Sequence, residues 1–369
     1  MKGLVIWAHS CCRSTMALYQ AIQKQAEFPV RIVVASAQTG GGLLVREARS
    51  KVGFRDNEFA DVQYTVLNGD FGLGIKIMDE CRGYAHLFCA YQMEPTYRRL
   101  IHEAHGRGER VFVGCEAPCN MSWGWRGVLK NLYLRFILRM KIRGVVRIAE
   151  KFICFSGRND RLAVLAGWPA EKIVSFGYYP PPIEGSHRVE RVSNSPFVIL
   201  LTGVLARFRG ADIAVRALKV LKDRGVAYNA IITQEGELLD SLKEYASRFD
   251  LPIEFAGFLS MNELIHLYET CSVYVGAGRC EPWGMRLNDA LNCGAPLIVS
   301  REMGGVKFVD DYGCGLSYVN NDAIDLADKL QRLAEDIKLY RKVAKSAMLA
   351  AADIQPEVQA KVILRICAQ

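Results

Sequence analysis

The chain has 369 residues, 50% hydrophobic and 23% charged, with 47 Lys and Arg against 39 Asp and Glu, so its net charge is +8. This composition excludes intrinsic disorder, and the absence of repeats or a Gly-X-Y period excludes solenoids and fibres. A length about twice the roughly 150 residues of a typical domain predicts two domains. No charge-free apolar run approaches the roughly 20 residues that span a bilayer, and the short apolar start indicates a first strand rather than a signal peptide. The 12 cysteines are scattered without a CxxC pair, which is typical of reduced cytoplasmic proteins.

Short apolar runs rich in Val, Ile and Phe alternate with helical patterns along the whole chain. The runs are nearly continuous, as expected for parallel strands that are buried on both faces. This alternation predicts an α/β fold of two doubly wound, Rossmann-like domains that face each other across a cleft. The predicted strands cover residues 3–8, 30–36, 63–68, 86–91, 110–116, 152–156, 172–177, 197–202, 228–234, 253–258, 272–276, 295–300 and 315–319.

A proline-rich break separates the two halves. Residues 178–182 contain three consecutive prolines, and a polar stretch follows to residue 195. Prolines exclude a helix and a central strand, so this segment is a stiff linker. We predict an N-terminal domain at 1–180, a linker at 181–195 and a C-terminal domain at 196–350. Residues 351–369 should form a C-terminal helix that packs back on the first domain.

The run from Glu281 to Pro296 carries the most chemical information. Glu281 lies in a loop just after a strand, Gly284 allows a close backbone approach, and a helix then begins. The free N–H groups and partial positive charge of a helix N-terminus suit a phosphate. Asp289 follows eight residues after Glu281, about two helical turns on, where it can accept hydrogen bonds from sugar hydroxyls.

This run resembles the E-x7-E segment of the retaining, GT-B-fold glycosyltransferases that use nucleotide sugars, the group 1 or family 4 type. The resemblance covers roughly residues 196–319, is weaker in the first domain, and is that of a divergent member. It implies that Glu281 lies by the donor sugar and phosphate and that Trp283, Gly284 and Met285 line the donor. Asp289 takes the place of the family's ribose-binding Glu and is one methylene shorter.

A second loop, Gly203–Gly210, resembles the family's G-R-L-x-x-x-K-G loop, whose two cations hold the donor diphosphate. Arg209 stands at the Lys position and can grip phosphate with two hydrogen bonds. Val204 stands where the family has Arg, so that contact is either missing or supplied by Arg207. The loops at 234–237 and 304–308 depart from the family pattern, and they leave the nucleotide open between UDP and GDP.

The first domain should bind the acceptor. Glu116 follows the predicted strand at 110–116, so it lies at a carboxyl end of the sheet. There it would orient an acceptor hydroxyl or act as a general base, and the latter would fit inversion rather than retention. His9, at the end of the first strand, contacts the donor or is structural. The resemblance implies no cofactor and no catalytic metal, because helix dipole and cations stabilise the leaving diphosphate.

Much of the net charge lies in one segment. Residues 117–149 contain no acidic residue and seven basic ones. The apolar positions 129, 132, 133, 136, 137 and 140 share one face of an ideal helix. Tryptophans at positions 123 and 125 precede it, and Trp favours the bilayer interface. The pattern is typical of a helix that lies on a membrane, although a domain helix packed into the core and a nucleic-acid patch remain alternatives. The predicted membrane-surface residues are Trp123, Trp125, Lys130, Arg135, Arg139, Arg143 and Arg147.

These features together predict a hexosyltransferase, of retaining type by resemblance. It would move a sugar from a nucleotide donor to a glycan acceptor that is lipid-linked, in bacterial-type surface polysaccharide or glycolipid synthesis. Its expected place is the cytoplasm, peripheral to the inner face of the cell membrane, with an anionic membrane surface and no nucleic acid as partner. The alternatives are a nucleotide-sugar epimerase on the same fold and a non-catalytic nucleotide-sugar or RNA-binding protein.

Overall fold

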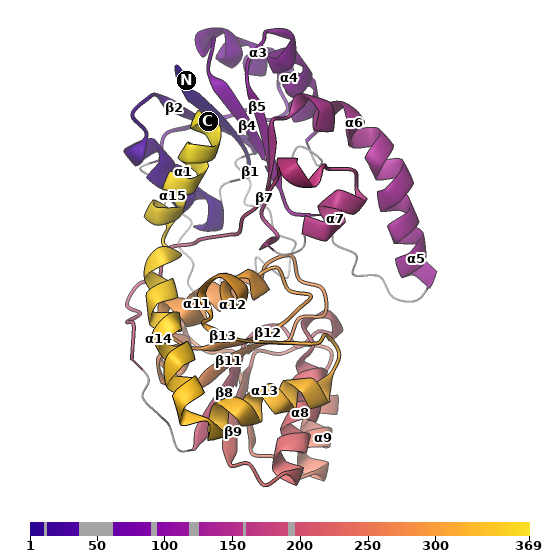
Figure 1. Ribbon diagram of the computed structural model, residues 1–369, viewed down its shortest axis with the longest axis vertical. Coiled ribbons are helices and arrows are strands. Elements are labelled where there is room, and N and C mark those ends of the chain that lie inside the picture. The colour runs from indigo at the N-terminus through magenta and orange to yellow at the C-terminus, as the bar shows by residue number, and fades with distance from the viewer. Residues whose placement is uncertain (11–12, 37–61, 90–93, 118–124, 158–159, 191–195) are drawn as a thin grey trace. The chain divides into compact units, whose positions relative to one another are not determined.

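The computed structural model describes residues 1–10, 13–36, 62–89, 94–117, 125–157, 160–190 and 196–369. The described residues form two compact units. The first consists of the chain up to Pro181 together with Gln355–Gln369, and the second is Pro182–Ile354. Each unit contains a parallel sheet with helices packed against it (Figure 1).

The first unit has a seven-stranded parallel sheet in the order β3-β2-β1-β4-β5-β6-β7. The order reverses direction between β1 and β4, as in doubly wound folds. The strands are β1 (Leu4–Ser10), β2 (Val30–Ser36), β3 (Tyr64–Val66), β4 (Ala85–Cys89), β5 (Val111–Cys115), β6 (Lys151–Cys154) and β7 (Ile173–Ser175). The helices are α1 (Arg13–Gln25), α3 (Phe71–Glu80), α4 (Pro95–Gly106), α5 (Trp125–Leu132), η1 (Tyr133–Leu138), α6 (Arg139–Ile148), α7 (Asp160–Leu165), η3 (Ala170–Lys172) and α15 (Pro356–Ala368).

Aromatic side chains fill the core of this unit. The rings of Trp7 and Phe88, on adjacent strands, stack with centroids 5.3 Å apart, and Tyr97 meets both edge-on. The last helix, α15, also belongs to this unit, because it packs against α1. Arg110 Nη1 donates to the carbonyl of Cys367 at 3.0 Å and ties the end of α15 to the start of β5. The final residues thus pack on the first unit.

The second unit has a six-stranded parallel sheet in the order β10-β9-β8-β11-β12-β13. The strands are β8 (Phe197–Leu201), β9 (Tyr228–Thr233), β10 (Ile253–Gly257), β11 (Val273–Gly276), β12 (Leu297–Ser300) and β13 (Gly315–Tyr318). The helices are η4 (Arg207–Arg209), α8 (Ala211–Asp223), α9 (Leu239–Arg248), α10 (Met261–Thr270), α11 (Met285–Asn292), α12 (Val306–Tyr312), α13 (Ala323–Glu335) and α14 (Ile337–Asp353).

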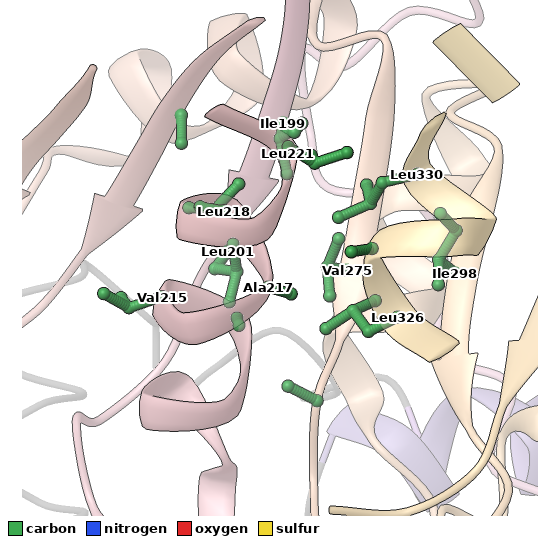
Figure 2. Close-up of a cluster of buried hydrophobic side chains, with 14 of the residues drawn as sticks. Ile199, Leu201, Val215, Ala217, Leu218, Leu221, Val275, Ile298, Leu326 and Leu330 are labelled. Atoms are coloured by element: carbon green, nitrogen blue, oxygen red, sulfur yellow. The ribbon is translucent and has the colours of Figure 1, made fainter. Parts of the chain in front are cut away.

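Aliphatic side chains form the core of the second unit. Figure 2 shows Leu218 and Leu221 of α8 and Leu326 and Leu330 of α13 directed toward the sheet, where Val275 lies. These side chains are at most 2% exposed, and at about 25 cal/mol per Å² such burial is the main favourable term in folding. Strands buried on both faces explain why their sequences are continuous apolar runs.

The predicted architecture is confirmed. A strand lies within or across each of the thirteen predicted ranges, all pair in parallel, and the class is α/β with two Rossmann-like units. Ser260 and Glu263 form the expected capping box at the start of α10.

One helix departs from its predicted geometry. The basic helix spans α5, η1 and α6 without a break, and η1 is a π-helical stretch of six residues. A π segment has more residues per turn than an α-helix, so it shifts the faces of the helix that follows. Leu134, Leu138 and Ile142, spaced by four residues as on one face of a helix, turn inward, and Leu134 and Ile142 are 2% and 3% exposed.

Candidate functional site

A pocket lies where the order of strands in the second unit reverses, between β8 and β11. In open α/β sheets, ligands bind at such a switch point, beyond the carboxyl ends of the strands. The loops after β8 and β11 and the start of α11 supply the lining. It includes Thr202, Gly203, Val204, Arg209, Glu281, Gly284 and Arg286.

The loop after β8 is held tightly from two sides. Leu205 donates its N–H to the carbonyl of Glu235 at 2.9 Å, and Leu238 donates to the carbonyl of Leu205 at 3.0 Å. On the other side Gly210 has φ +72, and a Cβ there would lie 2.0 Å from the carbonyl oxygen of Ala277. Only glycine combines that backbone angle with that close approach. The loop is thus a rigid support for Arg209.

Arg279, in the loop after β11, locks the same loop in place. Its side chain is 6% exposed and forms a two-point ion pair with Asp212 of α8, with Nη–Oδ distances of 2.7 and 2.6 Å. Its Nη1 also donates to the carbonyl of Arg207, and its Nε donates to Oδ1 of Asn321 at 2.7 Å. Arg279 could not be predicted from the sequence, because an Arg in a Gly-rich loop gives no signal of burial.

Glu281 and Arg209 form an ion pair inside the pocket. The Glu281 side chain is 13% exposed, and Gly304 donates its N–H to the carbonyl of Glu281 at 3.0 Å. Nε of Arg209 is buried and has no hydrogen-bond partner among the described residues. The two predicted residues, 72 positions apart in the sequence, therefore meet at one site, with a donor group of Arg209 still unsatisfied.

The start of α11 provides backbone groups at the same pocket. Gly284, its N-cap, has φ +98 and offers no side-chain cap, so N–H groups of the first helical turn are open to a ligand. A Cβ at Gly284 would lie 2.6 Å from Cε of Met303. The Glu281–Gly284 segment is held further by Gly305, which donates its N–H to the carbonyl of Trp283 at 2.9 Å.

Four residues predicted to bind the donor do not line this pocket. The Trp283 side chain is 1% exposed, donates to Oδ1 of Asn288 at 2.8 Å and packs edge-on against Phe308, so it is a core side chain that supports the loop from beneath. Met285 and Asp289 lie on α11, both partly buried and outside the lining. Arg207 is exposed, and its backbone N–H donates to Oε1 of Glu237 at 2.9 Å.

Arg286 lines the pocket, although sequence reasoning gave it no role. It is partly buried, with Nη1 3.5 Å from Oγ1 of Thr202. Tyr268 and Tyr274 also contact that hydroxyl, at 3.0 and 3.1 Å. Burial would lower the pKa of Arg286, but Tyr268, Tyr274 and Asp289 raise it above its ordinary value, so the guanidinium stays charged. The sequence signal that could have identified Arg286 is the phase of helix α11, which places position 286 on the side that faces the pocket.

In the first unit, two predicted residues lie at the carboxyl edge of the sheet. Glu116 is exposed directly after β5. His9, near the end of β1, has its Nδ1 3.0 Å from Oε1 of Glu94, the N-cap residue of α4.

The predicted apolar face of the basic helix is exposed rather than packed in the core. Leu129, Leu132, Tyr133, Phe136, Ile137 and Met140 are 54%, 47%, 39%, 58%, 44% and 71% exposed. Among the described residues, none of the predicted basic positions 130, 135, 139, 143 and 147 forms an ion pair with an acidic side chain. Trp123 lies outside the described residues, and α5 begins at Trp125. Figure 1 shows α5 at the free end of this long helix, away from the strands of its unit.

Neither a metal cluster nor a membrane span occurs in the described part of the chain. No group of three or more His, Cys, Asp or Glu is placed there to hold an ion. No described helix is both long and apolar enough to cross a bilayer.

Comparison with known proteins shows which proteins this chain resembles. Residues 183–349 match the family model for glycosyl transferases group 1. A GDP-mannose-dependent alpha-(1-6)-phosphatidylinositol dimannoside mannosyltransferase of Mycobacterium tuberculosis is 35% identical over 117 residues, 31% of this chain. Mannosylfructose-phosphate synthase of Agrobacterium fabrum is 26% identical over 159 residues, 40% of this chain. The chain matches only about a third of the length of these relatives, 30% and 35%.

Two solved structures share the whole architecture at low sequence identity. Anabaena Alr3699/HepE, in complex with UDP and glucose, has a TM-score of 0.63 at 15% identity, with 100% of each chain covered. A glycosyltransferase from Rickettsia africae has a TM-score of 0.62 at 13% identity, with 99% of this chain and 98% of the other covered. At such identity the likeness shows the fold, which is GT-B. Residues 183–349 are therefore similar to the glycosyl transferases group 1, within a chain that has the GT-B fold of two Rossmann-like units.

Proposed function

We propose that this chain is a hexosyltransferase that moves a sugar from a UDP- or GDP-linked donor to a glycan acceptor. In the reaction the bond from the anomeric carbon to the diphosphate oxygen breaks and a bond to an acceptor hydroxyl oxygen forms. The acceptor proton leaves with the nucleoside diphosphate. The relatives support both nucleotides, since one is named for GDP-mannose and the Anabaena structure contains UDP and glucose. None of the proteins named above has a name that describes an epimerase or an RNA-binding protein.

The observation that carries this proposal is the Glu281–Arg209 pair at the N-terminus of α11. Cations and open backbone N–H groups stabilise the negative charge that develops on a leaving diphosphate. Glu281, already held by Arg209, would lie at the junction of sugar and phosphate, and Asp289 at the ribose. Such a site requires no metal ion, because the protein itself supplies the positive charge.

We propose that the configuration at the anomeric carbon is retained, as in the enzymes with the E-x7-E segment. In this mechanism Glu116 accepts a hydrogen bond from the acceptor hydroxyl and orients it, rather than acting as the general base of an inverting enzyme. The coupling constant of the anomeric proton in the product, measured by NMR, decides between the two outcomes. A β-linked product from an α-linked donor would contradict retention.

We further propose that the acceptor is lipid-linked and that the enzyme works at the inner face of the cell membrane, in surface polysaccharide or glycolipid synthesis. The helix from α5 to α6 supports this, because its exposed apolar side chains lie among basic residues without acidic partners. That arrangement suits an anionic bilayer surface. Each Lys or Arg near such a surface contributes about 1 kcal/mol of binding, so four or five are enough for reversible docking.

A donor panel tests the activity directly. The chain is incubated with UDP- and GDP-linked hexoses, each with and without a polyprenyl-diphosphate glycan extract, and released diphosphate and product are measured. Release that depends on the acceptor supports a transferase. A changed sugar without acceptor would indicate an epimerase, and binding without turnover of any donor would indicate a non-catalytic protein. Either result would overturn the proposal.

A further inference from the structure

We infer that Arg286 is the second cation of the diphosphate site, in the role left open by Val204. The inference rests on the proposed function and assigns a further specificity-determining residue to it. Arg286 comes from the first turn of α11 rather than from the loop after β8. It would therefore reach the ligand from α11, whereas the family's Arg at the position of Val204 would reach it from the loop after β8. Arg286 and Arg209 nevertheless line the same pocket.

The first line of evidence is the position of Arg286 on its helix. It is the second residue of α11, whose first turn contains no acidic residue. A positive side chain at a helix N-terminus is unfavourable, because the helix dipole is positive there. An anion bound at this end would be stabilised by the dipole, the open N–H groups and Arg286 together.

The second line of evidence is the set of neighbours around Arg286. Its Nη1 donates to the Thr202 hydroxyl at 3.5 Å, and Tyr268 is also a hydrogen-bond partner, but it forms no ion pair with any carboxylate of the described residues. Burial raises the pKa of Tyr274 to about 12 and that of Tyr268 further, so both phenols are neutral. The charge of Asp289 also stabilises the guanidinium, but a guanidinium has five N–H donors, more than these contacts use, so donor groups remain available to a ligand.

The third line of evidence is an unsatisfied donor in the same pocket. Nε of Arg209 is buried, and the part of the chain that the structure describes offers it no hydrogen-bond partner. Two guanidinium groups and the N-terminus of α11 thus converge with unused donors, as a ligand with several anionic oxygens requires. Arg207, the other replacement for the missing cation, is exposed, lies outside the lining and fixes the loop by its backbone.

The experiment measures how much the second phosphate adds to affinity. Calorimetry gives the dissociation constants of UMP, UDP, GMP and GDP for the wild type and for Arg286→Gln, Arg286→Lys and Arg207→Gln. In the Arg286→Gln variant, the gain in affinity from monophosphate to diphosphate should fall by about 10- to 100-fold. This is the contribution expected of a pair of charge-assisted hydrogen bonds. Arg286→Lys should keep part of the gain, and Arg207→Gln should keep it within about twofold.

A second-site variant distinguishes direct contact from damage to the fold. Val204→Arg, added to Arg286→Gln, places a cation where the resembled family has one, and should restore at least part of the gain. An unchanged gain in Arg286→Gln, or a gain lost in Arg207→Gln instead, would overturn the inference while nucleotide binding itself stands. A wild-type chain that binds none of the four nucleotides would overturn both the inference and the proposed function.

Discussion

Arg279 and Asp212 form a two-point ion pair that joins the loop after β11 to the first turn of α8, with distances of 2.7 and 2.6 Å. Neither residue lines the pocket. The ion pair fixes the loop after β8, which carries Arg209, against the loop after β11, which carries Glu281. Because catalysis and binding depend on such placement within fractions of an ångström, the pair is a positioning device for both.

Replacing Arg279 should weaken folding and donor binding together. Arg279→Ala leaves Asp212, whose side chain is 30% exposed, with only Arg216 as an ion-pair partner, and this should cost roughly 1–3 kcal/mol of unfolding free energy. The matched control is Arg216→Ala, because Arg216 also pairs with Asp212, at 3.1 Å, but is half exposed. That variant should lose less than about 1 kcal/mol. Urea denaturation measures both, and equal effects would contradict the positioning role.

The same pair predicts a pH dependence of stability. Burial alone would raise the pKa of Asp212, but the guanidinium of Arg279 lowers it below its ordinary value of 3.8. A carboxyl with a lowered folded-state pKa contributes stability that is complete above the unfolded pKa and disappears as the pH falls through the folded one. The gap in unfolding free energy between wild type and Asp212→Asn should therefore be constant above about pH 5 and shrink below pH 4. A gap independent of pH between 3 and 7 would rule this out.

Removing the charge of Glu281 should separate binding from transfer. In Glu281→Gln, Arg209 loses its ion-pair partner, so the affinity for UDP or GDP should stay equal or increase. Transfer to the acceptor should fall by about 100-fold or more, as when one group that stabilises a transition state is removed. The control is Glu254→Gln, a change to an exposed carboxylate on β10. Calorimetry and diphosphate release measure the two effects, and near-normal transfer by Glu281→Gln would contradict the assignment.

Features that depend on neighbours in the sequence could be predicted, whereas features that depend on partners far away could not. The strands were recognisable because burial on both faces produces continuous apolar runs, and the Ser260 cap because its partner is three residues on. Arg279 could not be recognised, since its partner Asp212 is 67 positions away. Trp283 was misleading, because an aromatic side chain in a motif that binds a ligand can equally be a core residue of the supporting loop.

The basic helix shows a different limit of sequence reasoning. Ideal α-helical spacing grouped the right apolar residues, but it left open whether they pack in the core. The structure decides this, because Leu134 and Ile142, on the opposite face of the helix, are buried, whereas the predicted apolar face is exposed. The exposed face therefore became visible only in the structure.

The exposed face leads to the last prediction, which concerns membrane docking and separates charge from apolar contact. Replacing Arg135, Arg139, Arg143 and Arg147 by Glu should abolish sedimentation with anionic liposomes, since it replaces attraction by repulsion. The matched control reverses the same number of charges on exposed positions of α14, Lys338, Arg341, Lys342 and Lys345. That variant should sediment much more strongly than the first, although both have the same net charge.

A second pair of variants tests the apolar contact on the same helix. Leu129, Phe136 and Met140 are 54%, 58% and 71% exposed, so changing all three to Ser should leave the unfolding free energy almost unchanged. The loss of that apolar surface should weaken liposome binding, also to vesicles at high salt, where charges are screened. Ile142→Ser, at a position 3% exposed, should instead destabilise the first unit by about 2 kcal/mol or more. If the triple variant bound liposomes as the wild type does, the helix would not insert its apolar face, because charge alone would then account for docking.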